Sequence, residues 1–230
     1  MSLSLQGVLA LGFLLGLRHA FEPDHLAAIS TLATRQGRIR DAAGLGVAWG
    51  AGHTLSIAAV ALLVLALGIS LPEQFALVGE LIVAGLLIAL GASVLLRYAR
   101  GRWHMHRHTH DGNAHLHLHS HAQSTSHQHK HPKWDLRRAL GFGLAHGMAG
   151  SAAVLVLVVA SATNAATRAA YIVAFGLGTI GGMLTVAFVL GAAIRAASQR
   201  GTRLATALHV AAAVMSVAVG LFLGIRILSV

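Results

Sequence analysis

A short stretch near the start of the chain, HAFEPDH from His19 to His25, places two imidazoles and two carboxylates within an otherwise apolar segment. Burying such groups is costly, so their presence in an apolar segment indicates a function. Imidazole nitrogen and carboxylate oxygen are suitable ligands for divalent transition metals such as nickel, cobalt and zinc. The motif therefore predicts a metal site.

The spacing of this motif requires a broken helix. On a regular helix His19, Asp24 and His25 would point in different directions. Pro23 offers no N–H to the His19 carbonyl and disfavours helical dihedral angles in the residue before it. We expect the opened turn to let the side chains converge and to free a backbone carbonyl, which would attract a cation. His19, Asp24 and His25 are the predicted primary ligands.

Other residues could complete the site. His53 lies in WGAGHTLS, where glycines allow helices to approach closely, and we predict it as a further primary ligand, although a lone buried histidine is often only a core residue. Glu22 is a possible ligand, or else an attracting charge at the mouth of the site, a partner of Arg18, or a helix cap. His146, in GLAHGMAG, is a possible second ligand or a packed structural residue.

A second group of histidines forms a dense tract in the middle of the chain. A flexible tract rich in imidazole can hold several metal ions loosely, and we predict that it buffers metal. A proton buffer or pH sensor is the alternative, because histidine changes charge near neutral pH. The tract contains His104, His106, His108, His110, His115, His117, His119, His121, His127, His129 and His131.

The elements that position these residues are predicted to be membrane helices. The chain of 230 residues is 56% hydrophobic and only 10% charged, which is typical of an all-α polytopic membrane protein. A crossing needs about 20 apolar residues. We interpret the first apolar run as a broken membrane helix rather than a signal peptide, because it has no charged leader. Six spans are predicted, at 3–17 continuing to about 34, 42–69, 75–96, 139–161, 169–194 and 204–225.

The distribution of charge predicts an orientation. Most of the arginines and lysines fall in the loops that follow the first, third and fifth spans. By the positive-inside rule these loops, with the histidine tract, face the cytoplasm of a plasma (inner) membrane, and both termini lie outside. The net charge of +10 thus reflects topology, and we expect no nucleic-acid partner. The absence of cysteine excludes disulfides, zinc fingers and iron–sulfur sites.

The two halves of the chain resemble each other. GLRHAFEPDH, from Gly16, aligns with GLAHGMAGSA, from Gly143, and WGAGH aligns with FGLGT at nearly the same spacing. Two three-helix halves of opposite orientation would form an inverted repeat with a site near the membrane midplane, unless glycine and alanine match by chance. We predict a first repeat at 1–97, a cytoplasmic histidine-rich loop at 98–137 and a second repeat at 138–230.

The motif RHAFEPDH resembles the signature of the nickel/cobalt transporter family, H-x4-D-H with the fuller form R-H-A-x-D-A-D-H. The resemblance extends to GHT at Gly52–Thr54 and to FGLGT and HGMAGSAA in the second half. It implies metal recognition by His19, Asp24 and His25, with His53 contributing from the second helix. Glu-Pro replaces the Asp-Ala that is frequent in the family and resembles the H-x-L-E-P motif of related efflux proteins, and six spans replace the usual eight.

These observations predict a non-enzymatic secondary permease that takes up Ni²⁺ or Co²⁺ as its substrate and has no prosthetic group. No nucleotide-binding P-loop is visible in the sequence. The predicted partners are the metal ion and the lipid bilayer, with a cytosolic nickel-handling protein as a further candidate. Three alternatives stay open: a nickel or cobalt exporter, a membrane protein that senses nickel or delivers it for urease assembly, and a zinc enzyme that activates water.

Overall fold

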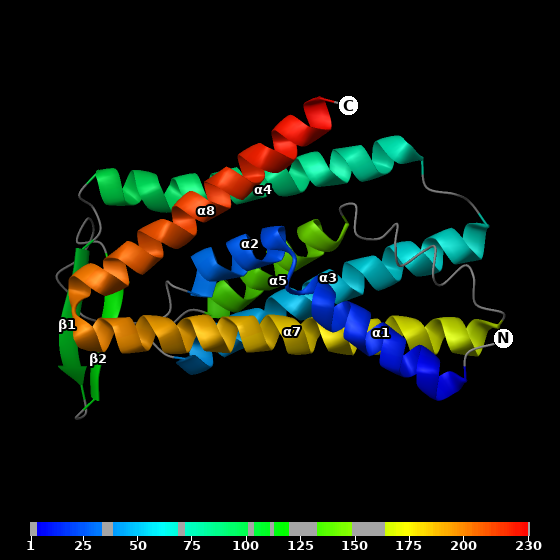
Figure 1. The fold of residues 1–230 in the computed structure, drawn as a ribbon, viewed down its shortest axis with the longest axis horizontal. Coiled ribbons are helices and arrows are strands. Elements are labelled where there is room, and N and C mark those ends of the chain that lie inside the picture. Colours follow the sequence, from blue (N-terminus) through cyan, green and yellow to red (C-terminus); the bar gives the residue numbers. More distant parts are fainter. Residues whose placement is uncertain are drawn as a thin grey trace.

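The computed structural model describes residues 4–33, 39–68, 72–100, 104–110, 113–119, 133–148 and 164–229. Within these ranges the chain forms seven α-helices and a two-stranded β-hairpin (Figure 1). The helices are α1 (Leu5–His19), α2 (Pro23–Ala33), α3 (Ile39–Leu67), α4 (Glu73–Ala99), α5 (Lys133–Gly147), α7 (Ala165–Arg200) and α8 (Thr202–Leu228); the strands are β1 (His104–His110) and β2 (Asn113–His119).

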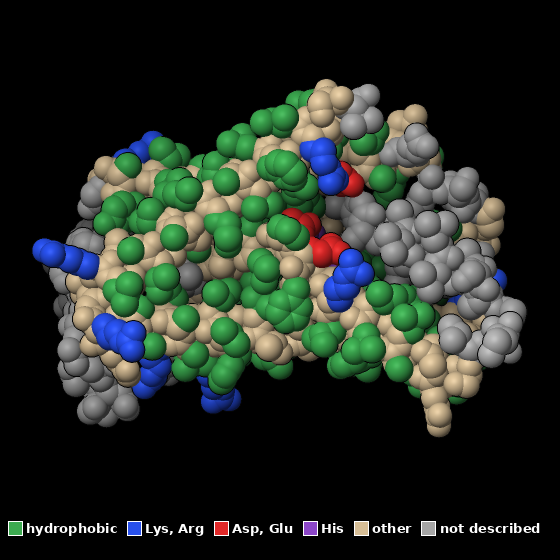
Figure 2. All heavy atoms as spheres, viewed as in Figure 1, with side chains coloured by type: hydrophobic (Ala, Val, Ile, Leu, Met, Phe, Trp, Pro, Cys, Tyr) green, Lys and Arg blue, Asp and Glu red, His purple; other side chains and the backbone are tan. Residues whose placement is uncertain are grey.

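Four of the described helices, α3, α4, α7 and α8, are long and apolar enough to cross a membrane. They coincide with the second, third, fifth and sixth predicted spans. Many large apolar side chains on these helices are exposed, and they cover much of the face shown in Figure 2. An apolar exterior of this extent is suited to lipid rather than water. Four of the six predicted spans are thus confirmed as helices that are long and apolar enough to cross a membrane.

The other two predicted spans differ from continuous helices. The first is divided into α1 and α2, and the break falls immediately before Pro23, as the sequence predicts. In the span predicted at 139–161, α5 ends at Gly147, so the expectation of one continuous helix there is wrong. Glycine lowers helix propensity by about 1 kcal/mol relative to alanine, which favours an end at this position. Residues 149–163 lie outside the described part of the chain.

The predicted histidine-rich loop contains regular structure that sequence analysis did not anticipate. β1 and β2 pair as antiparallel strands, and β1 places a histidine at every second residue. The hairpin lies at one end of the long helices, away from the start of α1 and the end of α8 (Figure 1). His121, His127, His129 and His131 lie outside the described residues. The register pairs His104 with His119, His106 with His117 and His108 with His115.

Glycines bring the helices into backbone contact. α1 packs on α7, α3 packs on α5 and α7, and α4 packs on α8. A Cβ at Gly16 of α1 would meet the Phe175 carbonyl of α7, and a Cβ at Gly143 of α5 would meet the Trp49 carbonyl of α3. Only a residue without a side chain permits this approach. The glycines thus fix how α1 and α5 lie on the two central helices, α3 and α7.

The core lies around these central helices. One buried apolar cluster joins α2, α3, α5 and α7 and includes Ile29, Leu45, Trp49 and Met183. A second contains Ile57 of α3 with Tyr171 and Phe175 of α7. Because both clusters contact the helices that bear the motif histidines, the packing of the core determines where those side chains lie.

Candidate metal centre

The break between α1 and α2 is closed by local hydrogen bonds. The Phe21 N–H donates to the Arg18 carbonyl, and the Glu22 N–H donates to the His19 carbonyl at 3.0 Å. The expectation that the His19 carbonyl lacks a hydrogen-bond donor is therefore wrong, because a tighter turn brings the Glu22 N–H to it where Pro23 has no N–H to offer. Proline then begins α2, a position where its missing N–H costs nothing. The result is a short, defined turn between two half-helices.

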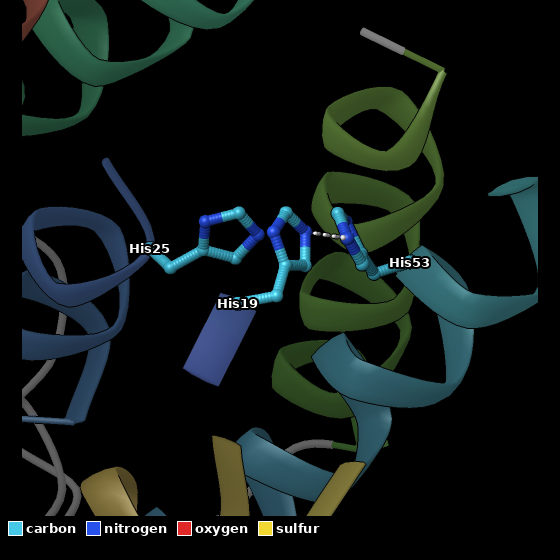
Figure 3. Close-up of side chains that lie close together, drawn as sticks. All are labelled: His19, His25 and His53. Atoms are coloured by element: carbon cyan, nitrogen blue, oxygen red, sulfur yellow. Dashed lines mark hydrogen bonds between the residues drawn. The ribbon is translucent and has the colours of Figure 1, made fainter. Parts of the chain in front are cut away.

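Three histidines from three helices meet at this turn (Figure 3). His19 ends α1, His25 lies in the first turn of α2, and His53 comes from the middle of α3. The Nε2 atoms of His19 and His53 are 3.0 Å apart. One ligand nitrogen from each ring lies within 4.8 Å of the other two. All three side chains are buried, with exposures of 7%, 1% and 0%.

The 3.0 Å distance between Nε2 of His19 and Nε2 of His53 fits two ligands of one metal ion, and a His25 nitrogen lies within 4.8 Å of both rings' ligand atoms. Imidazole nitrogens bound at about 2.1 Å to the same ion lie about 3 to 3.4 Å apart. Nε2 of His25 and Nδ1 of His53 are buried and lack a hydrogen-bond partner among the described residues. Unpaired buried polar atoms are uncommon because each costs about 1 to 3 kcal/mol. A bound cation would give the unpaired His25 nitrogen a partner.

Two carboxylates hold the outer nitrogens of these rings. Nδ1 of His19 is 3.0 Å from a Glu22 oxygen, and Nδ1 of His25 is 2.9 Å from Asp24 Oδ1. Metal-binding histidines usually have their second nitrogen bound to a carboxylate or carbonyl, which fixes the tautomer and the ring orientation. Glu22 and Asp24 lie where such orienting groups are expected.

Asp24 also joins the site to the second half of the chain. Its Oδ2 atom is 3.0 Å from Nε2 of His146 in α5. Asp24, His25 and His146 form a second group with metal-binding spacing, and this group shares His25 with the first. The structure therefore brings together all six membrane residues that the sequence singles out as primary or possible ligands. It puts Asp24 beside His146 and His25 rather than among the three clustered imidazoles.

Aromatic rings that sequence analysis missed form walls of the site. Phe175 lies 5.6 Å from the ring of His19, and Trp49 lies 5.6 Å from the ring of His146, measured between centroids. Trp49 also stacks on Phe142 at 6.1 Å. The alignment of WGAGH with FGLGT contained a signal for these residues, because it places Trp49 and Phe175 at matching positions.

A cavity of about 710 Å³ gives access to the centre. Its lining includes His19, Asp24 and His146, and it extends between α4 and α8 to Glu80 and Arg226. The site is thus a buried cluster of imidazoles with a polar approach, in a helical membrane protein. His209 of α8 is buried outside both metal-binding groups.

Comparison with known proteins agrees with this class. Residues 5–117 match the NicO family, described as "High-affinity nickel-transport protein", and this range includes the motif and His53. The match confirms the resemblance to the nickel/cobalt transporter family. The chain is also 29% identical over 187 residues to "Urease accessory protein UreH" from Bacillus sp. (strain TB-90), covering 81% of this chain and 77% of that protein. No solved structure matches.

Proposed function

We propose that this protein is a secondary transporter that carries Ni²⁺ or Co²⁺ into the cell across the plasma membrane. The observation that carries the proposal is the convergence of His19, His25 and His53 at a broken membrane helix. Discontinuous helices are where many secondary transporters bind their substrates. The family match supports nickel as the substrate.

The chemistry of the site suits this cargo. His19, His25 and His53 replace part of the ion's water shell with neutral nitrogen donors, which suit nickel and cobalt. Glu22 and Asp24 orient the rings and supply negative charge next to a divalent ion. His146, through Asp24, gives the ion a second set of donors. Because copper binds such donors more tightly, geometry must supply the selectivity.

The helices are arranged as two inverted three-helix repeats in this proposal, at 1–97 and 138–230, joined by the histidine-rich segment 98–137. Recurring contacts support it. The contact of Gly16 with the Phe175 carbonyl corresponds in the aligned halves to that of Gly143 with the Trp49 carbonyl. Between α4 and α8, Gly91 faces the Ala213 carbonyl, and Gly220 faces the Ala84 carbonyl.

The hairpin faces the cytoplasm and both termini lie outside. Arginines follow the first, third and fifth spans, and the hairpin lies away from the start of α1 and the end of α8 (Figure 1). An inside-negative potential then drives uptake, because a divalent charge crossing 100 mV gains about 4.6 kcal/mol, from about 2.3 per elementary charge. The histidine-rich segment receives the ion and buffers it.

Delivery of nickel to a cytosolic protein is the second candidate function. It is favoured by the similarity to a relative named as a urease accessory protein. In that case the histidine-rich segment would hand the ion to a nickel-handling partner after or instead of transport. Export by the same site is the third possibility, since the geometry of the histidine cluster does not depend on the direction of flux.

Flux of ⁶³Ni²⁺ into proteoliposomes of known orientation tests the proposal. The intact protein is expected to carry nickel towards the hairpin side, and His53→Ala is expected to abolish the flux. His209→Ala is the matched control, because it removes a buried histidine outside both metal-binding groups. Metal binding without flux would favour the delivery function, and lower nickel content in expressing cells would show export.

A further inference from the structure

The cavity that leads to the histidine cluster has an unusually acidic lining for this chain. Only seven aspartates and glutamates occur in 230 residues, and three of them, Glu22, Asp24 and Glu80, line this cavity. Glu22 and Asp24 contact the motif histidines. Glu80 does not belong to the motif, and it comes from a different helix, α4.

Glu80 is already paired with a cation. Its Oε2 atom accepts a hydrogen bond at 3.1 Å from a guanidinium nitrogen of Arg226 in α8. The side chains are 35% and 57% exposed, so both are reachable from outside the protein. Figure 2 shows acidic groups gathered beside basic ones at one place on a largely apolar face. An exposed pair of this kind contributes only about 0 to 1 kcal/mol to stability.

The position of the pair along the helices matches the entry side of the proposed transporter. Glu80 lies in the first third of α4, before that helix runs to the hairpin, and Arg226 lies three residues from the end of α8. Both therefore lie towards the side that is external in the proposed topology. Glu80 is more exposed than Asp24 and His19, which line the same cavity, with side-chain exposures of 35%, 23% and 8%.

We propose that Glu80 binds the incoming hydrated divalent cation first. Arg226 competes with the ion for the Glu80 carboxylate, and the ion must displace it. This inference rests on the proposed transport function. The guanidinium carries one positive charge, and the ion carries two, so the carboxylate binds the ion more strongly at equal distance. Arg226 has a long, largely exposed side chain that can move away without disturbing the helices.

The size of the cavity is consistent with capture before dehydration. A water molecule takes up about 30 Å³, so six waters around an ion need about 180 Å³. The cavity, at about 710 Å³, has room for such a hydrated ion, whereas the 3.0 Å between the His19 and His53 nitrogens suits direct coordination of an ion without water in between. Glu80 would hold the hydrated ion through its waters, and the imidazoles would then replace those waters one by one.

The proposed role of the pair, called the capture gate below, differs in its consequences from a purely structural role, in which the Glu80–Arg226 contact only holds α4 against α8 (a brace). In a brace, removing either partner weakens the same contact, so both variants lose function together and exchanging the two charges restores it. In a gate, the two residues act in opposite senses. Loss of Glu80 removes the attraction, whereas loss of Arg226 removes the competitor.

Initial rates of ⁶³Ni²⁺ transport into oriented proteoliposomes separate these cases. With nickel on the termini side, Glu80→Gln is expected to raise KM by about threefold or more at unchanged maximal rate, because charges lining a cleft raise the local counter-ion concentration about tenfold or more. Arg226→Gln is expected to lower KM. Asp41→Asn, an acid outside the cavity lining, serves as the matched control and should leave KM unchanged.

Three outcomes would overturn the gate. These are an unchanged KM in Glu80→Gln, parallel losses in both single variants, or recovery of normal KM in the double variant Glu80→Arg with Arg226→Glu. In each of these outcomes the intact protein still transports nickel. They would therefore refute the proposed role of Glu80 and Arg226 and leave the transport function unaffected. Absence of flux in the intact protein would instead refute the transport function itself.

Discussion

The chain contains two very different concentrations of histidine, the buried cluster of His19, His25 and His53 and the hairpin formed by β1 and β2. The cluster has three imidazoles drawn from three helices, and it depends on the packing of the whole molecule. The hairpin has seven histidines within two short strands, and its register alone decides which of them are opposite each other. Among the described residues, the buried cluster, although it has fewer histidines, is the group of imidazoles whose ligand atoms lie close enough to bind one metal ion.

Under the proposed function, the position of the histidines rather than their number makes the transport site. Each cluster histidine is buried, and His19 and His25 each have a carboxylate on the outer nitrogen. An ion must exchange its waters for these fixed donors, which gives selectivity by geometry. In the proposed topology the histidine-rich segment lies at the membrane surface and offers many donors, which suits buffering. The following predictions test this contrast in order of decreasing effect.

The largest effect is expected from removing a cluster histidine. His25→Ala removes the imidazole that both metal-binding groups share, and we expect nickel affinity in purified protein to fall by more than about 100-fold, since even outer-sphere partners are worth about 10- to 100-fold. Isothermal titration with all eleven histidines of the tract replaced measures this without interference. Undiminished nickel affinity in His25→Ala would show that nickel binds elsewhere than at the broken helix.

Asp24→Asn should have the next largest effect. The asparagine keeps the size of the side chain but loses the negative charge that holds the rings of His25 and His146. We expect nickel affinity to fall by about 10- to 100-fold. Glu22→Gln is the internal comparison and should lose less, because Glu22 is half exposed. A larger loss at Glu22 than at Asp24 would invert the roles given to the two carboxylates.

A packing change should have a smaller effect, and it should appear in stability rather than in chemistry. In Gly16→Ala the new methyl group would meet the Phe175 carbonyl, so α1 must move away from α7. We expect a loss of about 1 to 3 kcal/mol in unfolding free energy, the usual cost of overpacking. Gly141→Ala is the matched control, because its Cβ would meet nothing nearby. Thermal unfolding in detergent measures both variants.

The smallest effect on transport is expected from the hairpin. Replacing its histidines with asparagine should change the maximal rate of nickel flux by less than about twofold, because buffering alters occupancy near the membrane rather than the donors in the pathway. Nickel bound per chain should fall at the same time, as measured by elemental analysis. Loss of flux would show that the hairpin is part of the pathway. The replaced residues are His104, His106, His108, His110, His115, His117 and His119.

The sequence predicted the break and the approach of His19 to His25 because both follow from one residue. Pro23 cannot continue α1, and the turn before it brings His19 and His25 to the same side. It could not predict that the turn would supply a donor to the His19 carbonyl, since that depends on the backbone path at Glu22. Nor could the sequence tell metal ligands from the carboxylates that orient them. Asp24 contacts both His25 and His146 of α5, and the contact with α5 depends on how the helices pack.

The hairpin was missed for a different reason. The pattern H-x-H-x-H alternates with a period of two, which is typical of a strand. The prediction for this segment used only its histidine content and not this alternation. Similarly, the apolar run at 139–161 did not indicate that α5 ends at Gly147. Four membrane helices were predicted closely because long apolar runs have few alternatives in a chain of this composition.

The most direct test of the central claim is X-ray absorption spectroscopy of Ni²⁺ bound to the protein in which all eleven histidines of the tract, from His104 to His131, are replaced by asparagine. The account predicts about one ion per chain, with three imidazole nitrogens at about 2.1 Å, and loss of one of them in His53→Ala. A variant that binds no nickel, or binds it through oxygen alone, would contradict the account and place metal recognition in the histidine tract.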